Sequence, residues 1–259
     1  MRKFQGLYHP SYDHDACGVG VLANLNGYKS HDIIRNAIQV LENLGHRGAC
    51  GCDPATGDGA GLMFQIPHAF FRKECQLINI SLPEVEEYGI GMVFLPRDSK
   101  NRVWCEQKVE QIVLVEGQVF MGWRDVPTDA NQIGELAKKT SPFIRQFFVK
   151  RGKNIENREQ FERKLYVIRK VIESAIYQEL SGDDFYIVSL SSKTIIYKGL
   201  LRADQLVSFY DDLNDEMIVT ALALVHSRYS TNTLGSWQLA HPYRMLCHNG
   251  EINTIRGKK

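Results

Sequence analysis

Short apolar runs without polar alternation constrain the fold of this chain most. A strand that is apolar on both sides is buried on both faces, as in a sheet that helices cover. Such a pattern fits two stacked sheets with helices outside them, or one doubly wound sheet. The expected strands cover residues 18–25, 60–66, 88–95, 118–123, 143–149, 185–190, 194–198, 218–226 and 244–247.

Segments of helical period lie between these runs. In residues 31–44 the apolar side chains form one stripe, Ser30 is placed as an N-cap, and Gly45 suits the helix end. We expect strands 185–190 and 194–198 to form a hairpin. No linker divides the chain, so one domain is expected. The other expected helices cover residues 102–115, 131–139, 157–177 and 203–213, with a short helix after Pro67.

Composition excludes several classes of protein. The chain has 259 residues, with 31 basic and 30 acidic side chains, so nothing suggests a nucleic-acid-binding surface. No apolar run approaches the ~20 residues that a membrane-spanning helix needs. Residues 1–16 lack the apolar core of a secretory signal, and the six cysteines are irregularly spaced. We expect a cytoplasmic protein with reduced thiols and no membrane partner.

Cys17 is the first candidate for chemistry. It lies in Asp-Ala-Cys-Gly-Val-Gly, directly before an apolar run. If residues 1–16 were removed as a leader, Cys17 would carry a free α-amino group with a pKa of about 7.7–8.0. That amine could activate the thiol of the same residue. Gly18 would let a substrate approach closely. The alternative is an ordinary buried cysteine at the start of a strand.

Two motifs follow the first expected helix. Arg47, in His-Arg-Gly-Ala, would favour a nearby thiolate, or would cap the helix end instead. Residues 50–61 hold two cysteines and two aspartates, but their spacing matches neither a zinc nor a calcium site. We therefore expect no metal, and a tight loop near the active site. Asp53 and Asp58 are expected to accept hydrogen bonds from local amides.

Two polar motifs end apolar strands. Arg228, Thr231 and further hydroxyl groups in residues 226–233 could hold a carboxylate, since guanidinium matches it with two hydrogen bonds. The alternative is a polar loop that leaves the sheet. Asn249 and the Gly250 N–H could form an oxyanion hole. The alternative there is a common Asn-Gly turn.

Taken in order, these segments resemble the start of glutamate synthase large subunits, their class II glutamine amidotransferase domain. The resemblance extends over residues 12–257 and includes Gln-Ile-Pro-His at 65–68 and Gly-Trp-Arg-Asp-Val-Pro at 122–127. The segments that carry it are Cys-Gly-Val-Gly at 17–20, His-Arg-Gly-Ala at 46–49, Cys-Asp-Pro-Ala-Thr-Gly-Asp-Gly-Ala-Gly at 52–61, His-Ser-Arg-Tyr-Ser-Thr-Asn-Thr at 226–233 and His-Asn-Gly-Glu-Ile-Asn at 248–253.

The resemblance implies an α+β fold, the four-layer αββα sandwich of N-terminal nucleophile hydrolases. Residues 1–16 would be a leader and residues 17–259 the amidotransferase domain. The family pattern continues beyond Lys259, so we expect a fragment that is incomplete at its C-terminus.

The resemblance also assigns roles to single residues. The substrate would be L-glutamine, whose side-chain amide is hydrolysed through a thioester on Cys17. The implied roles are Cys17 as nucleophile, Asn249 and Gly250 as the oxyanion hole, Arg47 as support for Cys17, and Arg228 with Thr231 as the clamp for the glutamine carboxylate.

The resemblance places the cofactors outside this chain. FMN and an iron–sulfur cluster belong to the full-length enzyme, which adds the ammonia to 2-oxoglutarate. The implied partners are the remaining glutamate synthase domains and a small subunit. Two other hypotheses stay open. The chain could be a non-catalytic remnant, or an N-terminal nucleophile hydrolase that acts on another amide.

Overall fold

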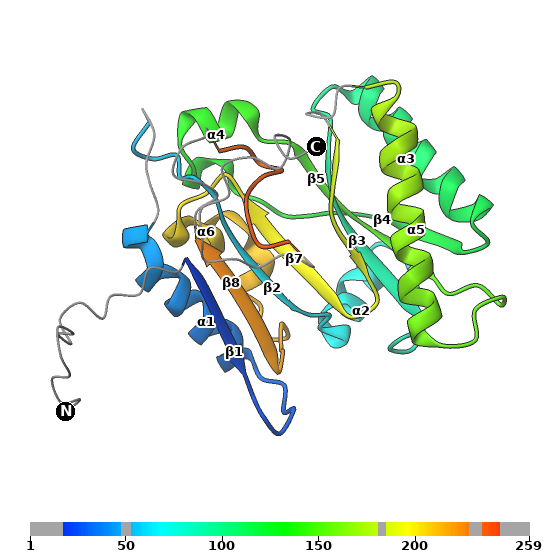
Figure 1. Cartoon of the computed structure of the whole chain (residues 1–259), viewed down its shortest axis with the longest axis horizontal. Coiled ribbons are helices and arrows are strands. Elements are labelled where there is room, and N and C mark those ends of the chain that lie inside the picture. Colours follow the sequence, from blue (N-terminus) through cyan, green and yellow to red (C-terminus); the bar gives the residue numbers. More distant parts are fainter. Residues whose placement is uncertain (1–17, 48–52, 181–184, 228–234, 244–259) are drawn as a thin grey trace, which may run out of the picture.

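The strands of the chain form two sheets rather than one. The computed structural model describes residues 18–47, 53–180, 185–227 and 235–243. Within these residues the order is β1-β8-β2-β7 in the first sheet and β4-β5-β3-β6 in the second, with every pair antiparallel (Figure 1). The fold class is α+β. The strands are β1 (Val19–Ala23), β2 (Ala60–Gln65), β3 (Tyr88–Leu95), β4 (Val119–Asp125), β5 (Phe143–Lys150), β6 (Tyr186–Ser191), β7 (Thr194–Gly199) and β8 (Leu222–Ser227).

The helices are mostly close to their expected positions. The expected helix 131–139 is two short pieces, and the expected helix 203–213 is three. The helix expected from residue 102 begins at Ser99, because the Asp98 side chain accepts a hydrogen bond from the Asn101 N–H at 2.8 Å. The helices are α1 (His31–Asn43), η2 (Leu44–Arg47), α2 (His68–Leu77), α3 (Ser99–Val115), η3 (Ala130–Gln132), α4 (Glu135–Thr140), α5 (Arg158–Tyr177), η4 (Ala203–Gln205), α6 (Leu206–Phe209) and η5 (Asp211–Asn214).

In the second sheet, β3 and β6 are buried on both faces, as their apolar runs predict. Along β3, Val93 and Leu95 face α3 and α5, which lie side by side against this sheet (Figure 1). The alternate residues of β3 belong to a second cluster, which also holds buried residues of the first sheet, α1 and α2. We call the cluster under α3 and α5 the outer core. It consists of Val93, Leu95, Cys105, Val109, Ile112, Val113, Phe147, Val149, Phe161, Leu165, Ile168, Ile172, Ile176, Phe185, Ile187 and Leu190.

The first sheet packs against α1. Ile34, Ala37 and Leu41 are buried at helical spacing and form the stripe expected from the sequence. Ser30 occupies the N-cap position, although its side chain makes no capping hydrogen bond. On β1, a Cβ at Gly20 would lie 2.5 Å from Cγ1 of Val40. The absence of a side chain at Gly20 therefore lets α1 approach the sheet.

The prediction that β6 and β7 form a hairpin is wrong. β6 pairs with β3 in the second sheet, whereas β7 pairs with β2 in the first, so the chain crosses between the sheets at this turn. The buried Glu162 carboxylate stabilises the crossing. It accepts hydrogen bonds from the Ser191 hydroxyl at 3.1 Å and from the Ser192 N–H. A short polar turn reveals that two strands are consecutive, but not which strands they pair with.

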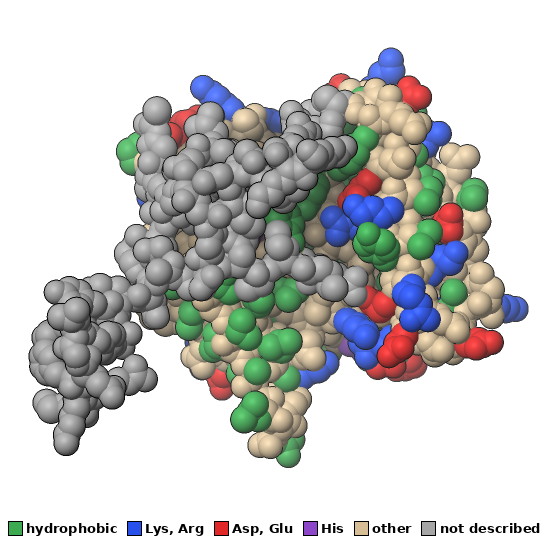
Figure 2. Space-filling model, viewed as in Figure 1, with side chains coloured by type: hydrophobic (Ala, Val, Ile, Leu, Met, Phe, Trp, Pro, Cys, Tyr) green, Lys and Arg blue, Asp and Glu red, His purple; other side chains and the backbone are tan. Residues whose placement is uncertain are grey.

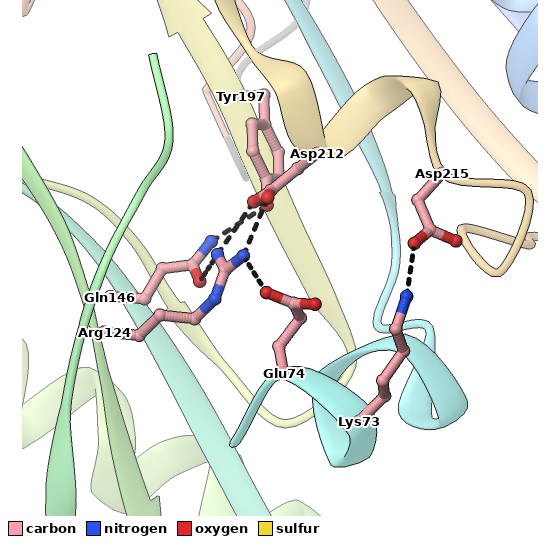
Figure 3. A network of polar contacts seen from close by, with 7 residues as sticks. All are labelled: Lys73, Glu74, Arg124, Gln146, Tyr197, Asp212 and Asp215. Carbon is pink, nitrogen blue, oxygen red and sulfur yellow. Dashed lines mark hydrogen bonds and ion pairs between the residues drawn. The ribbon is translucent and has the colours of Figure 1, made fainter. Parts of the chain in front are cut away.

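A buried network of polar side chains also joins the two sheets (Figure 3). Arg124 on β4 donates two hydrogen bonds to Asp212, at 2.8 and 2.9 Å, and one to Glu74 on α2 at 2.8 Å. Tyr197 on β7 donates to the same Asp212 at 2.7 Å, and Gln146 on β5 donates to Tyr197 at 2.9 Å. The network therefore reaches from the second sheet to the first.

The surface carries charges of both signs. In the view of Figure 2, basic and acidic side chains are interspersed over the side formed by α3 and α5, with no large patch of one sign. Within the described ranges, no helix combines the length and the apolar character that crossing a bilayer requires.

Candidate functional site

One edge of the first sheet gathers segments that are far apart in the sequence. The Ser227 N–H donates to the Gly18 carbonyl at 2.7 Å, and Ser227 is also paired with Ala60, which is paired with Gly199. We call these four residues the edge row. Because the strands are antiparallel, β1 and β2 begin at this row, and β8 and β7 end there. Several of the motifs identified in the sequence thus meet at one place.

Gly18 has a backbone role in the edge row. A Cβ at this position would lie 2.3 Å from the Ser227 carbonyl oxygen, closer than two such atoms can approach. The sequence suggested that Gly18 leaves room for a substrate. The structure gives a different reason for a glycine, since β1 and β8 could not pair at this point with a larger residue.

The loop before β2 is anchored through Asp53. Its carboxylate accepts hydrogen bonds from the Thr56 hydroxyl at 2.7 Å, the Ala55 N–H at 3.0 Å and the Leu136 N–H at 3.2 Å. These bonds hold the pKa of Asp53 below its usual value. The bond from Thr56 has the largest effect, followed by the bonds from the Leu136 and Ala55 amides. The expected bond from Asp53 to a local amide is confirmed. The equivalent expectation for Asp58 stays a prediction.

Glycines of this loop and of β2 itself let two other segments pack over the start of β2. A Cβ at Gly57 would lie 2.4 Å from the Leu201 carbonyl oxygen, and a Cβ at Gly61 would lie 2.4 Å from that of His241. The residues after β7 and residues 235–243 therefore contact the loop closely. This fits the expectation of a tight, glycine-dependent loop.

A cavity of about 290 Å³ lies beside the edge row. It joins the end of α1, the loop before β2 and the end of β8. The short helix η2 lies against β8 and η4 in the same region. The lining residues are Glu42, Gly45, Gly57, Asp58, Gly59, Leu201, Arg202, Ala203, Asp204 and Ser227.

Most of the proposed site residues are outside the described part of the chain. Arg47 is the last residue of η2, so its backbone belongs to the segment that lies against β8. The proposed site residues that lie outside the described ranges are Cys17, Arg228, Thr231, Asn249 and Gly250. Their roles stay predictions. In the described ranges, no three His, Cys, Asp or Glu side chains are gathered as metal ligands would be.

Lys198, on β7 beside the edge row, is a buried lysine that the sequence did not single out. Its Nζ donates hydrogen bonds to the carbonyl oxygens of Gln238 at 2.8 Å and Ala240 at 2.6 Å. Burial lowers the pKa of this amine well below its usual value, with Arg169 acting in the same direction. The available signal was a lysine inside the otherwise apolar run Ile-Ile-Tyr-Lys-Gly at 195–199.

Residues 17–259 match the family model described as "Glutamine amidotransferases class-II". The chain therefore belongs to the class II glutamine amidotransferases, a family of enzymes. It is 53% identical to the "Glutamate synthase [NADPH] large chain" of Bacillus subtilis, over 99% of this chain and 17% of that protein.

Other relatives carry related names. The chain is 45% identical to the "Glutamate synthase [NADPH] large chain" of Azospirillum brasilense, over 96% of this chain and 16% of that protein. It is 44% identical to the "Ferredoxin-dependent glutamate synthase 1, chloroplastic/mitochondrial" of Arabidopsis thaliana, over 93% of this chain and 15% of the relative. The chain thus spans less than a fifth of the length of these proteins.

Proposed function

We propose that this chain hydrolyses the side-chain amide of L-glutamine with Cys17 as nucleophile, and that the ammonia serves glutamate synthesis from 2-oxoglutarate. The pairing of Gly18 with Ser227 carries the proposal. Cys17 directly precedes Gly18 and Arg228 directly follows Ser227. The proposed nucleophile and the proposed carboxylate clamp are therefore each one peptide unit away from a hydrogen-bonded pair.

The proposed reaction begins after removal of residues 1–16. The free α-amino group of Cys17 accepts the thiol proton, and the thiolate attacks the amide carbon of glutamine. Asn249 and the Gly250 N–H stabilise the oxyanion that forms. The C–N bond breaks, ammonia leaves with the proton, and a thioester remains. Water then attacks the thioester, which releases glutamate and restores the thiol.

The remaining site residues hold the substrate or tune the thiol. Arg228 and Thr231 bind the α-carboxylate of glutamine by charge-assisted hydrogen bonds. Arg47 lowers the pKa of the Cys17 thiol through its positive charge. The position of η2 against β8 supports a place for Arg47 near the edge row.

We also infer that the sheets and helices form the four-layer sandwich of N-terminal nucleophile hydrolases. The packing of α1 on the first sheet and of α3 and α5 on the second supports this arrangement. The second cluster, which contains buried residues from both sheets, supports it further.

The longer relatives suggest the partners of the chain. We propose that it acts with the remaining glutamate synthase domains and a small subunit, in the cytoplasm, and that FMN and an iron–sulfur cluster are bound outside it. Such a cluster needs several cysteine thiolates together. The described Cys75 and Cys105 do not fit, because they are buried in separate cores.

The test is ammonia release from L-glutamine by the 259-residue chain and by Cys17→Ala. We expect release by the unaltered chain, loss of release in Cys17→Ala, and retained release in Cys105→Ala, whose thiol is buried in the outer core. Mass spectrometry should show that the active chain begins at Cys17.

Three results would contradict the proposal. Ammonia release by Cys17→Ala would exclude Cys17 as nucleophile. Hydrolysis of other amides but not of glutamine would favour a different N-terminal nucleophile hydrolase. A chain with a free N-terminal Cys17 that hydrolyses no amide would favour the non-catalytic remnant.

A further inference from the structure

Lys198 is an unusual residue for the interior of the first sheet. Its side chain is 0% exposed, and the two carbonyl oxygens of Gln238 and Ala240 accept hydrogen bonds from its Nζ. The ring centroids of Tyr186 and Tyr243 lie 4.8 and 4.2 Å from the same nitrogen. Within the part of the chain that the structure describes, no carboxylate forms an ion pair with it.

Stability alone does not account for this lysine. Burial of an amine without a counter-ion costs free energy, and a well-packed apolar side chain at such a position is often neutral or stabilising. Two other residues of β7, Ile195 and Ile196, are apolar and fully buried. What Lys198 adds to the strand is a pair of hydrogen bonds to one particular segment.

That segment, residues 235–243, lies over the first sheet next to the edge row. Gly61 is paired with both Lys198 and His226, so these three residues share one face of the sheet. The rings of His226 and His241 lie 4.5 Å apart, centroid to centroid. A Cβ at Gly61 would meet the His241 carbonyl oxygen. The segment therefore rests on β2, β7 and β8 together.

We propose that Lys198 is a positioning residue for glutamine hydrolysis, which fixes residues 235–243 against the strands that end at the edge row. The inference rests on the proposed function. Lys198 itself contacts no reacting atom. It acts through the segment that it binds, and this segment precedes the proposed oxyanion residues in the sequence.

The main test is Lys198→Met in the 259-residue chain. Methionine has a similar length but no N–H donor, and it removes the cost of a buried amine. We expect a folded protein whose kcat for glutamine hydrolysis falls roughly ten- to hundredfold, the effect of small misplacements near reacting groups. KM for glutamine should change by less than about threefold, because oxyanion stabilisation acts on the transition state.

Two variants serve as controls. Lys193→Met removes an exposed lysine from the turn before β7 and should leave kcat unchanged. Lys198→Gln keeps an N–H donor and should retain more activity than Lys198→Met. If Lys198 served stability alone, folded Lys198→Met and Lys198→Gln would have the same kcat and the same KM.

Trp237 reports the position of the segment without any assay of activity. Its ring is 4% exposed and its Nε1 donates to the Ala137 carbonyl at 3.2 Å. In a background with Trp104→Phe and Trp123→Phe it is the single tryptophan of the chain. We expect Lys198→Met to shift its emission to longer wavelength and to increase quenching by acrylamide.

The outcomes separate this inference from the proposed function. A folded Lys198→Met with the kcat of the unaltered chain, or with an unchanged Trp237 signal, overturns the inference alone. If Lys198→Met does not fold, kcat and the Trp237 signal are measured for Lys198→Gln instead. A value of either that equals the value of the unaltered chain then overturns the inference. Failure of both variants to fold would make Lys198 a stability residue and overturn the inference. An unaltered chain that releases no ammonia contradicts the proposed function and, with it, the inference.

Discussion

Single glycines determine how closely the segments at the edge row approach one another. Gly18 and Gly61 each lie where a Cβ would meet a backbone carbonyl oxygen, that of Ser227 and that of His241. A backbone atom cannot move aside as the end of a flexible side chain can. Close contacts between segments of the chain thus explain why Gly18 and Gly61 are glycines.

Gly18→Ala tests this explanation. We expect the substitution to separate the ends of β1 and β8 and to lower the free energy of unfolding by about 1–3 kcal/mol, the usual cost of overpacking. Urea denaturation measures the change. Gly45→Ala is the control, since a Cβ at Gly45 would have no atom within 4 Å. Equal stability of the two variants would contradict the explanation.

Some residues could be identified from the sequence and others could not. The glycine-rich loop and its Asp53 bond were predictable, because an aspartate followed by small residues bonds to nearby amides. Lys198 and Arg124 were not, because their partners are distant. Lys198 binds a carbonyl group 42 residues later, and Arg124 binds a carboxylate 88 residues later. Neither pairing leaves a local pattern in the sequence.

Elements were predicted well where periodicity and capping determine them. Strand β3 has the bounds 88–95 that its apolar run indicates, and α1 has the expected stripe and N-cap position. Pairing between strands was predicted less well. The turn between β6 and β7 looked like a hairpin, but the partners of both strands come from other parts of the chain. The helix expected at 203–213 is broken, although most of its apolar residues are buried.

Glu162→Gln tests how α5 holds the crossing between the sheets. A carboxylate can accept the Ser191 and Ser192 hydrogen bonds on one oxygen or both, whereas an amide offers a single acceptor oxygen. We expect a loss of about 1.5–3 kcal/mol in unfolding free energy, as for hydrogen bonds to charged groups. Thermal and urea unfolding give the value.

The matched control lies on the same helix. Glu159 is exposed, so Glu159→Gln should change the free energy of unfolding by no more than about 0.5 kcal/mol. A Glu162→Gln variant that is as stable as Glu159→Gln would mean that the crossing is held by packing alone.

At the scale of the whole molecule, a network of buried charges joins the two sheets. Arg124 is 5% exposed and lies between Asp212 and Glu74, whereas Lys73 and Asp215 form a more exposed ion pair nearby (Figure 3). Loss of one partner from a buried pair leaves the other charge without compensation. Loss of one partner from an exposed pair leaves the other charge in contact with water.

Arg124→Met should therefore destabilise the protein by about 3–5 kcal/mol, because the Asp212 carboxylate stays buried without its guanidinium. Lys73→Met should cost much less, because water compensates the Asp215 carboxylate that remains. The difference in urea midpoints at constant slope measures both effects. If the two variants are equally stable, the network does not contribute to the joining of the sheets.

The crossing at the turn between β6 and β7 has a consequence for the order of folding. The second sheet uses one continuous stretch, from β3 to β6, whereas the first combines β1 and β2 with β7 and β8. During synthesis, the second sheet can begin to form while residues after Ser191 are still missing. The first sheet has to wait for β8 and then close long loops. The edge row is thus among the last parts to assemble, so a newly made chain acquires its proposed reaction centre only after most of its core is in place.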